Sequence, residues 1–116
     1  MRIENLAAIA SSGMRLESQR LAQSAANTAN VNTPGYEARR IVAASRRGGG
    51  VSGKSVPTYG ARGQRAQADA GASPLSNTDV AEERVTQLSS ARAFQANVAV
   101  LRTADEVLGE LIDRRA

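Results

Sequence analysis

The sequence has no cysteine, no histidine and no tryptophan, and each absence removes a class of function. Without cysteine the chain can form neither a disulfide nor a thiolate metal site. Without histidine it lacks the commonest general base and metal ligand. Only two tyrosines and one phenylalanine occur among 116 residues. We therefore expect stability to come from long helices or from partners rather than from a large core.

Long uninterrupted apolar runs are also missing. Near the N-terminus the apolar stretches are broken by polar residues, namely Glu4, Ser11, Ser12, Arg15 and Glu17. The sequence therefore predicts neither a cleavable secretory signal nor a membrane span. A protein of this kind that acts outside the cytoplasm would need another export route.

Residues 2–29 have the spacing of a long amphipathic helix. At about 100° per residue, its apolar side chains fall close to one face. They are Ile3, Leu6, Ala7, Ala10, Met14, Leu21 and Ala25, with only Glu17 interrupting the row. Ile9 and Leu16 lie off this face, which predicts a second buried surface. The alternative is that both are ordinary exposed aliphatic residues.

This helix pattern runs into a stretch of small and amide residues, AQSAANTANVNTPGY, at residues 22–36. Its alanines leave room for a close neighbouring helix, and its asparagine amides can bond a backbone. Pro34 then fixes φ at the second position of a turn, and Gly35 accepts a positive φ at the third. We expect a sharp helix exit here, with Tyr36 as an aromatic anchor just beyond it.

The middle of the chain has a different composition. Residues 37–77 hold seven Lys/Arg against two Asp/Glu, and eight of the ten glycines lie between residues 35 and 71. No regular element longer than a few residues is predicted there. Residues 41–44 could form a short strand, and residues 55–59 an extended piece that Pro57 would confine to an edge. Alone in water this segment should be loose.

Residues 48–55, GGGVSGKS, formally match the phosphate-binding loop pattern GxxxxGK[ST]. The context argues against nucleotide binding, because such a loop follows a buried strand and opens a helix. Here Arg46 and Arg47 precede the stretch and Pro57 follows it. A flexible glycine-rich linker is the prediction instead.

From Asp79 the pattern becomes helical again. Asp79 and Glu82 have the spacing of a capping box, which marks the helix start. Apolar residues then recur every three or four positions, as Ala81, Val85, Leu88, Ala91, Phe94, Val98, Leu101, Ala104, Leu108 and Leu111. This row predicts a seam for packing along a partner helix.

Both helical segments resemble one family, the bacterial flagellar axial proteins of the rod and hook, and the short proximal-rod proteins are nearest in size. The N-terminal motif ANxANxNTPGY is matched by Asn27, Asn30, Asn32, Thr33, Pro34, Gly35 and Tyr36, with Thr28 where the family usually has Ile, Leu or Val. The C-terminal motif is matched by Asp79, Glu82, Glu83, Val85, Arg92, Ala93, Phe94, Gln95, Asn97, Thr103, Ala104, Asp105 and Leu108.

Pattern and resemblance together predict an all-α or mainly α fold. Two long terminal helices form a coiled-coil pair, joined by an irregular Gly/Arg-rich loop with at most a short β-hairpin. The expected divisions are a rod helix and turn at residues 1–36, the basic loop at 37–77 and a second rod helix at 78–116, with both ends in one helical domain. Hook and distal-rod relatives carry a large β domain in the middle, which about forty residues cannot hold.

The resemblance implies a structural subunit of the flagellar basal-body rod that assembles by helix packing into a helical tube within the cell envelope. It implies export through the flagellar type III apparatus without a cleavable signal, and partners that are copies of itself or other rod proteins. We expect no enzyme activity, no cofactor, no metal and no small-molecule substrate. The predicted assembly residues are Asn27, Asn30, Asn32, Pro34, Gly35, Tyr36, Val85, Leu88, Arg92, Phe94, Gln95, Asn97, Val98, Leu101 and Leu108.

The alternative is a soluble coiled-coil protein that presents its basic loop to nucleic acid or to an anionic surface. The cations available are Arg39, Arg40, Arg46, Arg47, Lys54, Arg62 and Arg65. Against this, Tyr36 and Tyr59 are the only nearby aromatic residues, and no nucleic-acid module is recognised. An active site is not indicated either, because Ser89 and Ser90 have no histidine to activate them. The carboxylates of the last helix fall around it rather than into one pocket.

Overall fold

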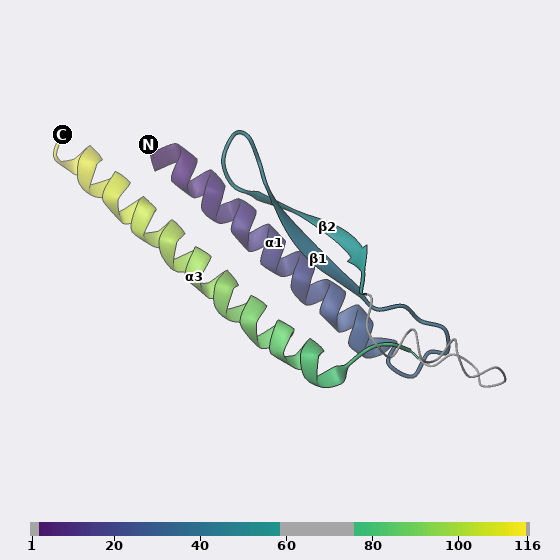
Figure 1. Ribbon diagram of the computed structural model, residues 1–116. Coiled ribbons are helices and arrows are strands. Elements are labelled where there is room, and N and C mark those ends of the chain that lie inside the picture. Colours follow the sequence, from purple (N-terminus) through teal and green to yellow (C-terminus); the bar gives the residue numbers. More distant parts are fainter. Residues whose placement is uncertain (1–2, 59–75, 116) are drawn as a thin grey trace.

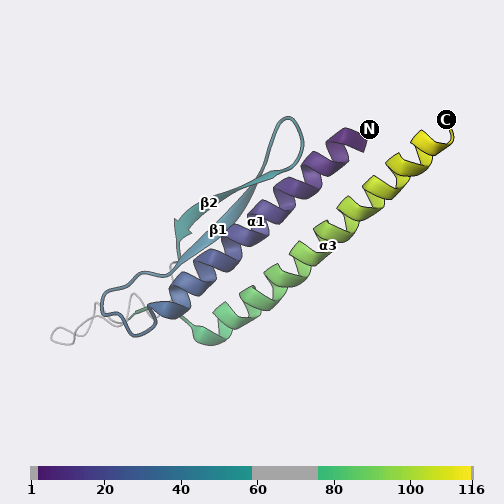
Figure 2. The same cartoon turned by 180° about the vertical axis from the view of Figure 1, so that it is seen from behind.

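The computed structural model describes residues 3–58 and 76–115. Its elements, in chain order, are α1 (Ile3–Ala29), β1 (Arg39–Ser45), β2 (Val51–Pro57) and α3 (Val80–Asp113). Figure 1 shows α3 running antiparallel beside α1, with the two strands lying against α1. The view from behind in Figure 2 shows the same order, hairpin, α1 and α3. The molecule is therefore elongated, and α1 contacts both other parts.

The predicted all-α fold with an irregular middle is wrong, because the basic middle segment forms a β-hairpin that packs on α1. The two seven-residue strands pair antiparallel in one register, from Arg39↔Pro57 to Ser45↔Val51. Gly49 and Gly50, with φ of 92° and 84°, form the tight turn between the strands. Two strands alone are marginal in water, so this hairpin depends on its helix support. Tyr59, Arg62 and Arg65 lie outside the described residues.

The hairpin covers a second face of α1. Leu16 is only 6% exposed and lies beneath Gly53 of β2. The Ser12 hydroxyl accepts a hydrogen bond from Val51 N at 3.0 Å, and the Ser55 hydroxyl donates to the Gln23 side chain at 3.3 Å. A side chain at Gly53 would meet those of Leu16 and Ile41, so this strand can approach the helix only with glycine there. The second buried surface predicted from Ile9 and Leu16 is confirmed for Leu16, whereas Ile9 is 38% exposed.

The predicted sharp exit after α1 and the predicted start of α3 are both confirmed. Tyr36 N donates to Thr33 O at 3.2 Å, and Gly35 has φ 73°, as a turn with proline second and glycine third requires. The Asp79 carboxylate accepts from Ala81 N at 3.0 Å and from Glu82 N at 3.3 Å, which caps α3. No described helix is long and apolar enough to cross a membrane.

The interior of the described chain contains more polar than apolar side chains. Its buried apolar side chains are Ala10, Leu16, Ala38 and Ala104, while its buried polar ones are Ser12, Glu17, Ser24, Asn27, Thr78 and Ser90. Large aliphatic residues are instead found outside, among them Val85, Leu88 and Ile112. The fully buried part of the helix interface thus consists mainly of small residues and hydrogen-bonding side chains, and much apolar area remains uncovered.

Candidate functional site

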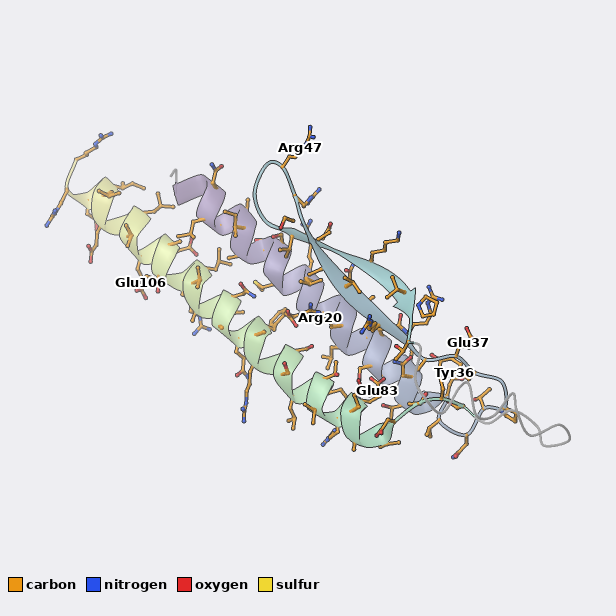
Figure 3. The ribbon with its side chains drawn as sticks, viewed as in Figure 1. Arg20, Tyr36, Glu37, Arg47, Glu83 and Glu106 are labelled. Atoms are coloured by element: carbon orange, nitrogen blue, oxygen red, sulfur yellow. The ribbon has the colours of Figure 1, made fainter. Side chains whose placement is uncertain are left out.

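Asn27 is the point at which the three parts of the molecule meet. Its side chain is 1% exposed. The amide nitrogen donates to Arg39 O and to the Glu83 carboxylate, both at 2.7 Å. The amide oxygen accepts from Arg39 N and from the Tyr36 hydroxyl, both at 3.1 Å. One amide therefore ties α1 to the start of β1 and to the first turn of α3, and Figure 3 shows Tyr36 and Glu83 beside this end of α1.

Further polar contacts join the same end of α1 to α3. The Ser24 hydroxyl donates to the backbone carbonyl of Glu83 at 3.0 Å. The Gln87 amide donates to the hydroxyls of Ser24 and Thr28, each at 3.3 Å. Ser24 is fully buried, so these bonds form away from water, where leaving a polar group unpaired is costly. They fix the axial register of the two helices.

Asn77 holds the chain segments that enter and leave this junction. Its side-chain oxygen accepts from Ala38 N at 2.6 Å, and its side-chain nitrogen donates to Thr58 O at 3.0 Å. Thr58 N in turn donates to Ala38 O at 2.8 Å. Asn77 thereby binds the residue before β1 and the residue after β2, which closes the junction around Asn27.

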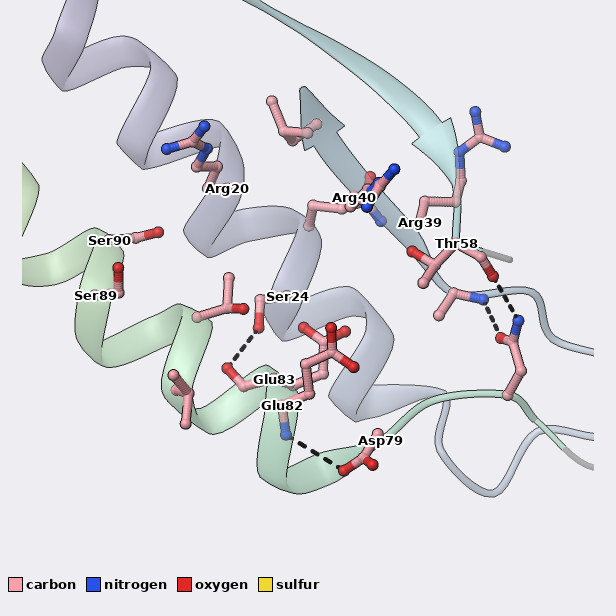
Figure 4. Close-up of a pocket in the computed structure, with 16 residues that line it drawn as sticks. Arg20, Ser24, Arg39, Arg40, Thr58, Asp79, Glu82, Glu83, Ser89 and Ser90 are labelled. Carbon is pink, nitrogen blue, oxygen red and sulfur yellow. Dashed lines mark hydrogen bonds between the residues drawn. The ribbon is translucent and has the colours of Figure 1, made fainter. Parts of the chain in front are cut away.

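An open groove of about 350 Å³ lies between α1, β1 and the start of α3. Figure 4 shows that its lining includes three cations, Arg20, Arg39 and Arg40, from α1 and β1, and three carboxylates, Asp79, Glu82 and Glu83, at the start of α3. Ser89 and Ser90 line it as well, but the sequence has no histidine that could activate them. Among the described residues, no group of acidic side chains is arranged to hold a metal ion. The groove has the character of a polar contact surface.

The N-terminal motif residues have different environments. Asn27 is buried, while Asn30 and Tyr36 are half-buried. The Asn30 amide donates to Ala26 O at 2.9 Å, within its own helix. Asn32, Pro34 and Gly35 are exposed at the turn. Asn27 and Tyr36 are thus part of the internal junction, and the rest of the motif is accessible to other molecules.

The apolar row predicted on the second helix divides into two faces. Phe94, Asn97, Val98, Leu101 and Leu108 are half-buried, and Asn97 lies against Gly13 of α1. The remaining predicted assembly residues of this helix are exposed, and they are Val85, Leu88, Arg92 and Gln95. The residues of the single predicted seam therefore lie on two different faces of α3. Those in the proximal half point outward, and those in the distal half lie on the internal face.

The sequence patterns did not place the polar residues at the start of α3 on the face that joins it to α1. The internal face repeats every three or four positions, as Glu83, Gln87, Ser90, Phe94, Asn97, Leu101, Ala104 and Leu108. This is a regular coiled-coil spacing. Half of these residues are polar. At the start of the helix, apolar periodicity therefore indicates Val85 and Leu88 rather than Glu83, Gln87 and Ser90. Ser24, Ala38 and Asn77 carried no local signal at all.

Two family models match this chain, one at each end. The model described as flagella basal body rod protein matches residues 8–36, which comprise most of α1 and the turn after it. The model described as flagellar basal body rod FlgEFG protein C-terminal matches residues 70–114, which include all of α3. No curated protein matches the chain. Both matched segments meet at the Asn27 junction.

Proposed function

Because the chain belongs to the flagellar basal body rod family, we propose that it builds the rod by binding other rod proteins through the outward face of α3. Rod families of this kind are structural and not enzymatic, and they are located in the flagellar basal body. In the proposal the two matched ends form one assembling helical unit, and repeated helix packing between units produces a helical tube.

The observation that supports this proposal most strongly is the exposure of large apolar residues on α3. Val85 is 66% exposed and Leu88 is 55% exposed, on the side of the helix opposite the internal face. Burying such a side chain fully contributes about 1.5 to 3 kcal/mol. A helix that needed only α1 would carry polar residues at these positions. The outward face is therefore suited to a neighbouring subunit.

A tube requires an open assembly. Each subunit would bind a neighbour through a surface different from the one by which its other neighbour binds it. Such head-to-tail contacts extend without limit when the rotation between neighbours does not close a ring. A helical tube is the expected product.

The test is the double substitution Val85→Ser with Leu88→Ser. Because both side chains are exposed, the isolated chain should keep its helical circular dichroism, while incorporation into basal bodies and swimming motility should be lost. Val80→Ser is the matched control, since Val80 is 50% exposed at the first position of α3 and off the outward face. Normal incorporation of the double variant would overturn the proposal.

A further inference from the structure

We propose that the hairpin of one copy binds the distal part of the outward face of α3 on a second copy, so that successive copies stack hairpin to helix. The inference rests on the proposed function and specifies which two surfaces meet. On the hairpin, the surface is the strand face turned away from α1 together with the turn. On α3, it is the face formed by Glu106, Val107, Glu110 and Asp113.

The outer face of the hairpin combines cations with valines. Strand pairing places Arg40 opposite Val56 and Val42 opposite Lys54. Val42, Lys54 and Val56 alternate with Ile41, Gly53 and Ser55, which are directed at α1, so these three belong to the other face of the sheet, whereas Arg40 lines the groove beside α3. Arg46 and Arg47 add two exposed cations at the turn. Residues 38–58 contain no carboxylate. A two-stranded sheet covered on one side only thus presents a basic, partly apolar surface.

The distal outward face of α3 has the complementary character. Glu110 lies four residues after Glu106, three after Val107 and three before Asp113, so the four residues lie on one side of the helix around Glu110. Val107 is 42% exposed, and Glu106, Glu110 and Asp113 are all exposed. Among the described residues the one ion pair joins Arg20 to Glu17. The hairpin cations and these carboxylates are therefore unpaired within the described parts of one chain.

The two surfaces lie on opposite sides of the molecule and cannot meet within one copy. Figure 3 shows Arg47 and Glu106 pointing away from α1 in opposite directions. Matched surfaces on opposite sides fit two different copies, and they produce a head-to-tail stack rather than a closed pair. Charge of opposite sign would also set the direction in which the copies add.

The contact requires neighbouring copies to be displaced along the helix axis. Gly49 at the hairpin turn lies beside Ile9, and Gly13 lies opposite Asn97. Because the helices are antiparallel, Ile9 is roughly level with residue 101 of α3. Glu106 and Glu110 follow five and nine residues later, a distance of about 8 to 14 Å at 1.5 Å per residue. A stagger of about 10 Å brings the turn of one copy to this face of the next.

Charge reversal in the full chain tests the contact by sedimentation velocity at low salt. One variant carries Arg46→Glu and Arg47→Glu, and the other carries Glu106→Arg and Glu110→Arg. Each alone should associate about tenfold more weakly than the unchanged chain or worse, since like charges then face each other. An equal mixture of the two variants, and a chain carrying all four substitutions, should recover association. All four positions are exposed, so circular dichroism should remain unchanged.

Failure of the four-substitution chain to recover would overturn the proposal. The variant with Arg46→Glu and Arg47→Glu is also tested for binding to a DNA duplex and to anionic vesicles. If the unchanged chain binds either one and this variant does not, the hairpin cations bind an anionic ligand rather than α3 of a second copy. Unchanged association of either two-substitution variant would overturn it as well.

Cross-linking locates the contact, because the chain has no cysteine of its own. A side chain added at Gly48 or at Gly109 would meet no atom within 4 Å. Copies with Gly48→Cys, mixed with copies with Gly109→Cys, should be joined by a short bismaleimide. Ala91→Cys is the control, since Ala91 is exposed and lies on the same flank of α3 about 27 Å away. Equal cross-linking at both α3 positions would contradict the contact.

This failure is separable from failure of the proposed function. If the copies with Gly48→Cys and Gly109→Cys are incorporated into basal bodies but are not joined by this cross-link, the proposed function stands and only the contact is removed. If the chain cross-links in solution but is absent from basal bodies, the contact stands and the proposed function is removed.

Discussion

At the residue scale, the molecule depends on one buried amide. Asn27 uses both of its side-chain atoms, with the nitrogen donating to two acceptors and the oxygen accepting from Arg39 N and the Tyr36 hydroxyl. No other residue type offers two donors and an acceptor in this shape except glutamine, which is one methylene longer. The hydrogen bonds within the chain therefore require asparagine at position 27.

Asn27→Asp should destabilise the chain by about 3 kcal/mol or more. The substitution replaces the donating nitrogen by an oxygen that faces Arg39 O and the Glu83 carboxylate, so it buries unpaired acceptors and a like-charge pair. Asn32→Asp is the matched control, because Asn32 belongs to the same motif and is exposed. Its effect should stay within about 0.5 kcal/mol. Urea unfolding of both variants measures the difference, and equal midpoints would contradict the role assigned to Asn27.

At the element scale, the hairpin distinguishes this fold from a plain helix pair. The strands hold four β-branched aliphatic residues, Ile41, Val42, Val51 and Val56, and the turn between them has glycines at positive φ. These local features favour a hairpin, but their stabilisation comes from contact with Leu16, Ser12 and Gln23 of α1. The support is therefore tertiary.

Leu16→Ala should release the hairpin from α1. Removing a buried leucine side chain costs about 2 to 5 kcal/mol, and Leu16 is the one large apolar side chain among the fully buried residues described. In native-state hydrogen exchange, amides of residues 39–57 should lose more protection than those of α3. Leu21→Ala, at a position 42% exposed, is the control and should leave the hairpin amides protected. Unchanged hairpin protection in Leu16→Ala would show that the strands do not depend on this contact.

The same contrast explains what could be predicted from sequence. The two helices, the turn at Gly35 and the cap at Asp79 follow from local signals, namely apolar spacing, proline and glycine chemistry, and an acidic cap. The sequence predicted at most a short hairpin. The two seven-residue strands and their packing on α1 were not predicted, because glycine and arginine dominate residues 46–54 and because the stability of the strands depends on α1. Local sequence does not record that dependence.

For the candidate site, prediction from sequence found the motif but not all of its internal partners. Asn27 and Tyr36 were identified through the family resemblance. Their partner Glu83, with Gln87 and Ser90 on the same side of α3, was not assigned to the interface, because polar residues on a coiled-coil face give no apolar periodicity. That face becomes visible only when both helices are placed together.

At the scale of the whole molecule, polar residues lie inside the helix pair and large aliphatic residues lie outside it. Val85, Leu88, Leu111 and Ile112 are each roughly half exposed or more. A soluble domain that works alone gains nothing from this distribution, whereas a subunit that packs against neighbours buries these residues on assembly. Under the proposed function, chain stability and assembly depend on different faces of α3. Substitutions on the two faces should separate folding from incorporation.

The central claim is that the outward face of α3 is buried against a neighbouring subunit in the rod. A cryo-electron microscopy map of purified basal bodies tests it most directly. The account predicts density for α1, α3 and the hairpin within the rod, with Val85 and Leu88 in contact with an adjacent subunit. A map that places the chain in the rod with these two side chains facing solvent, or that shows no copy of the chain in the rod, would contradict it.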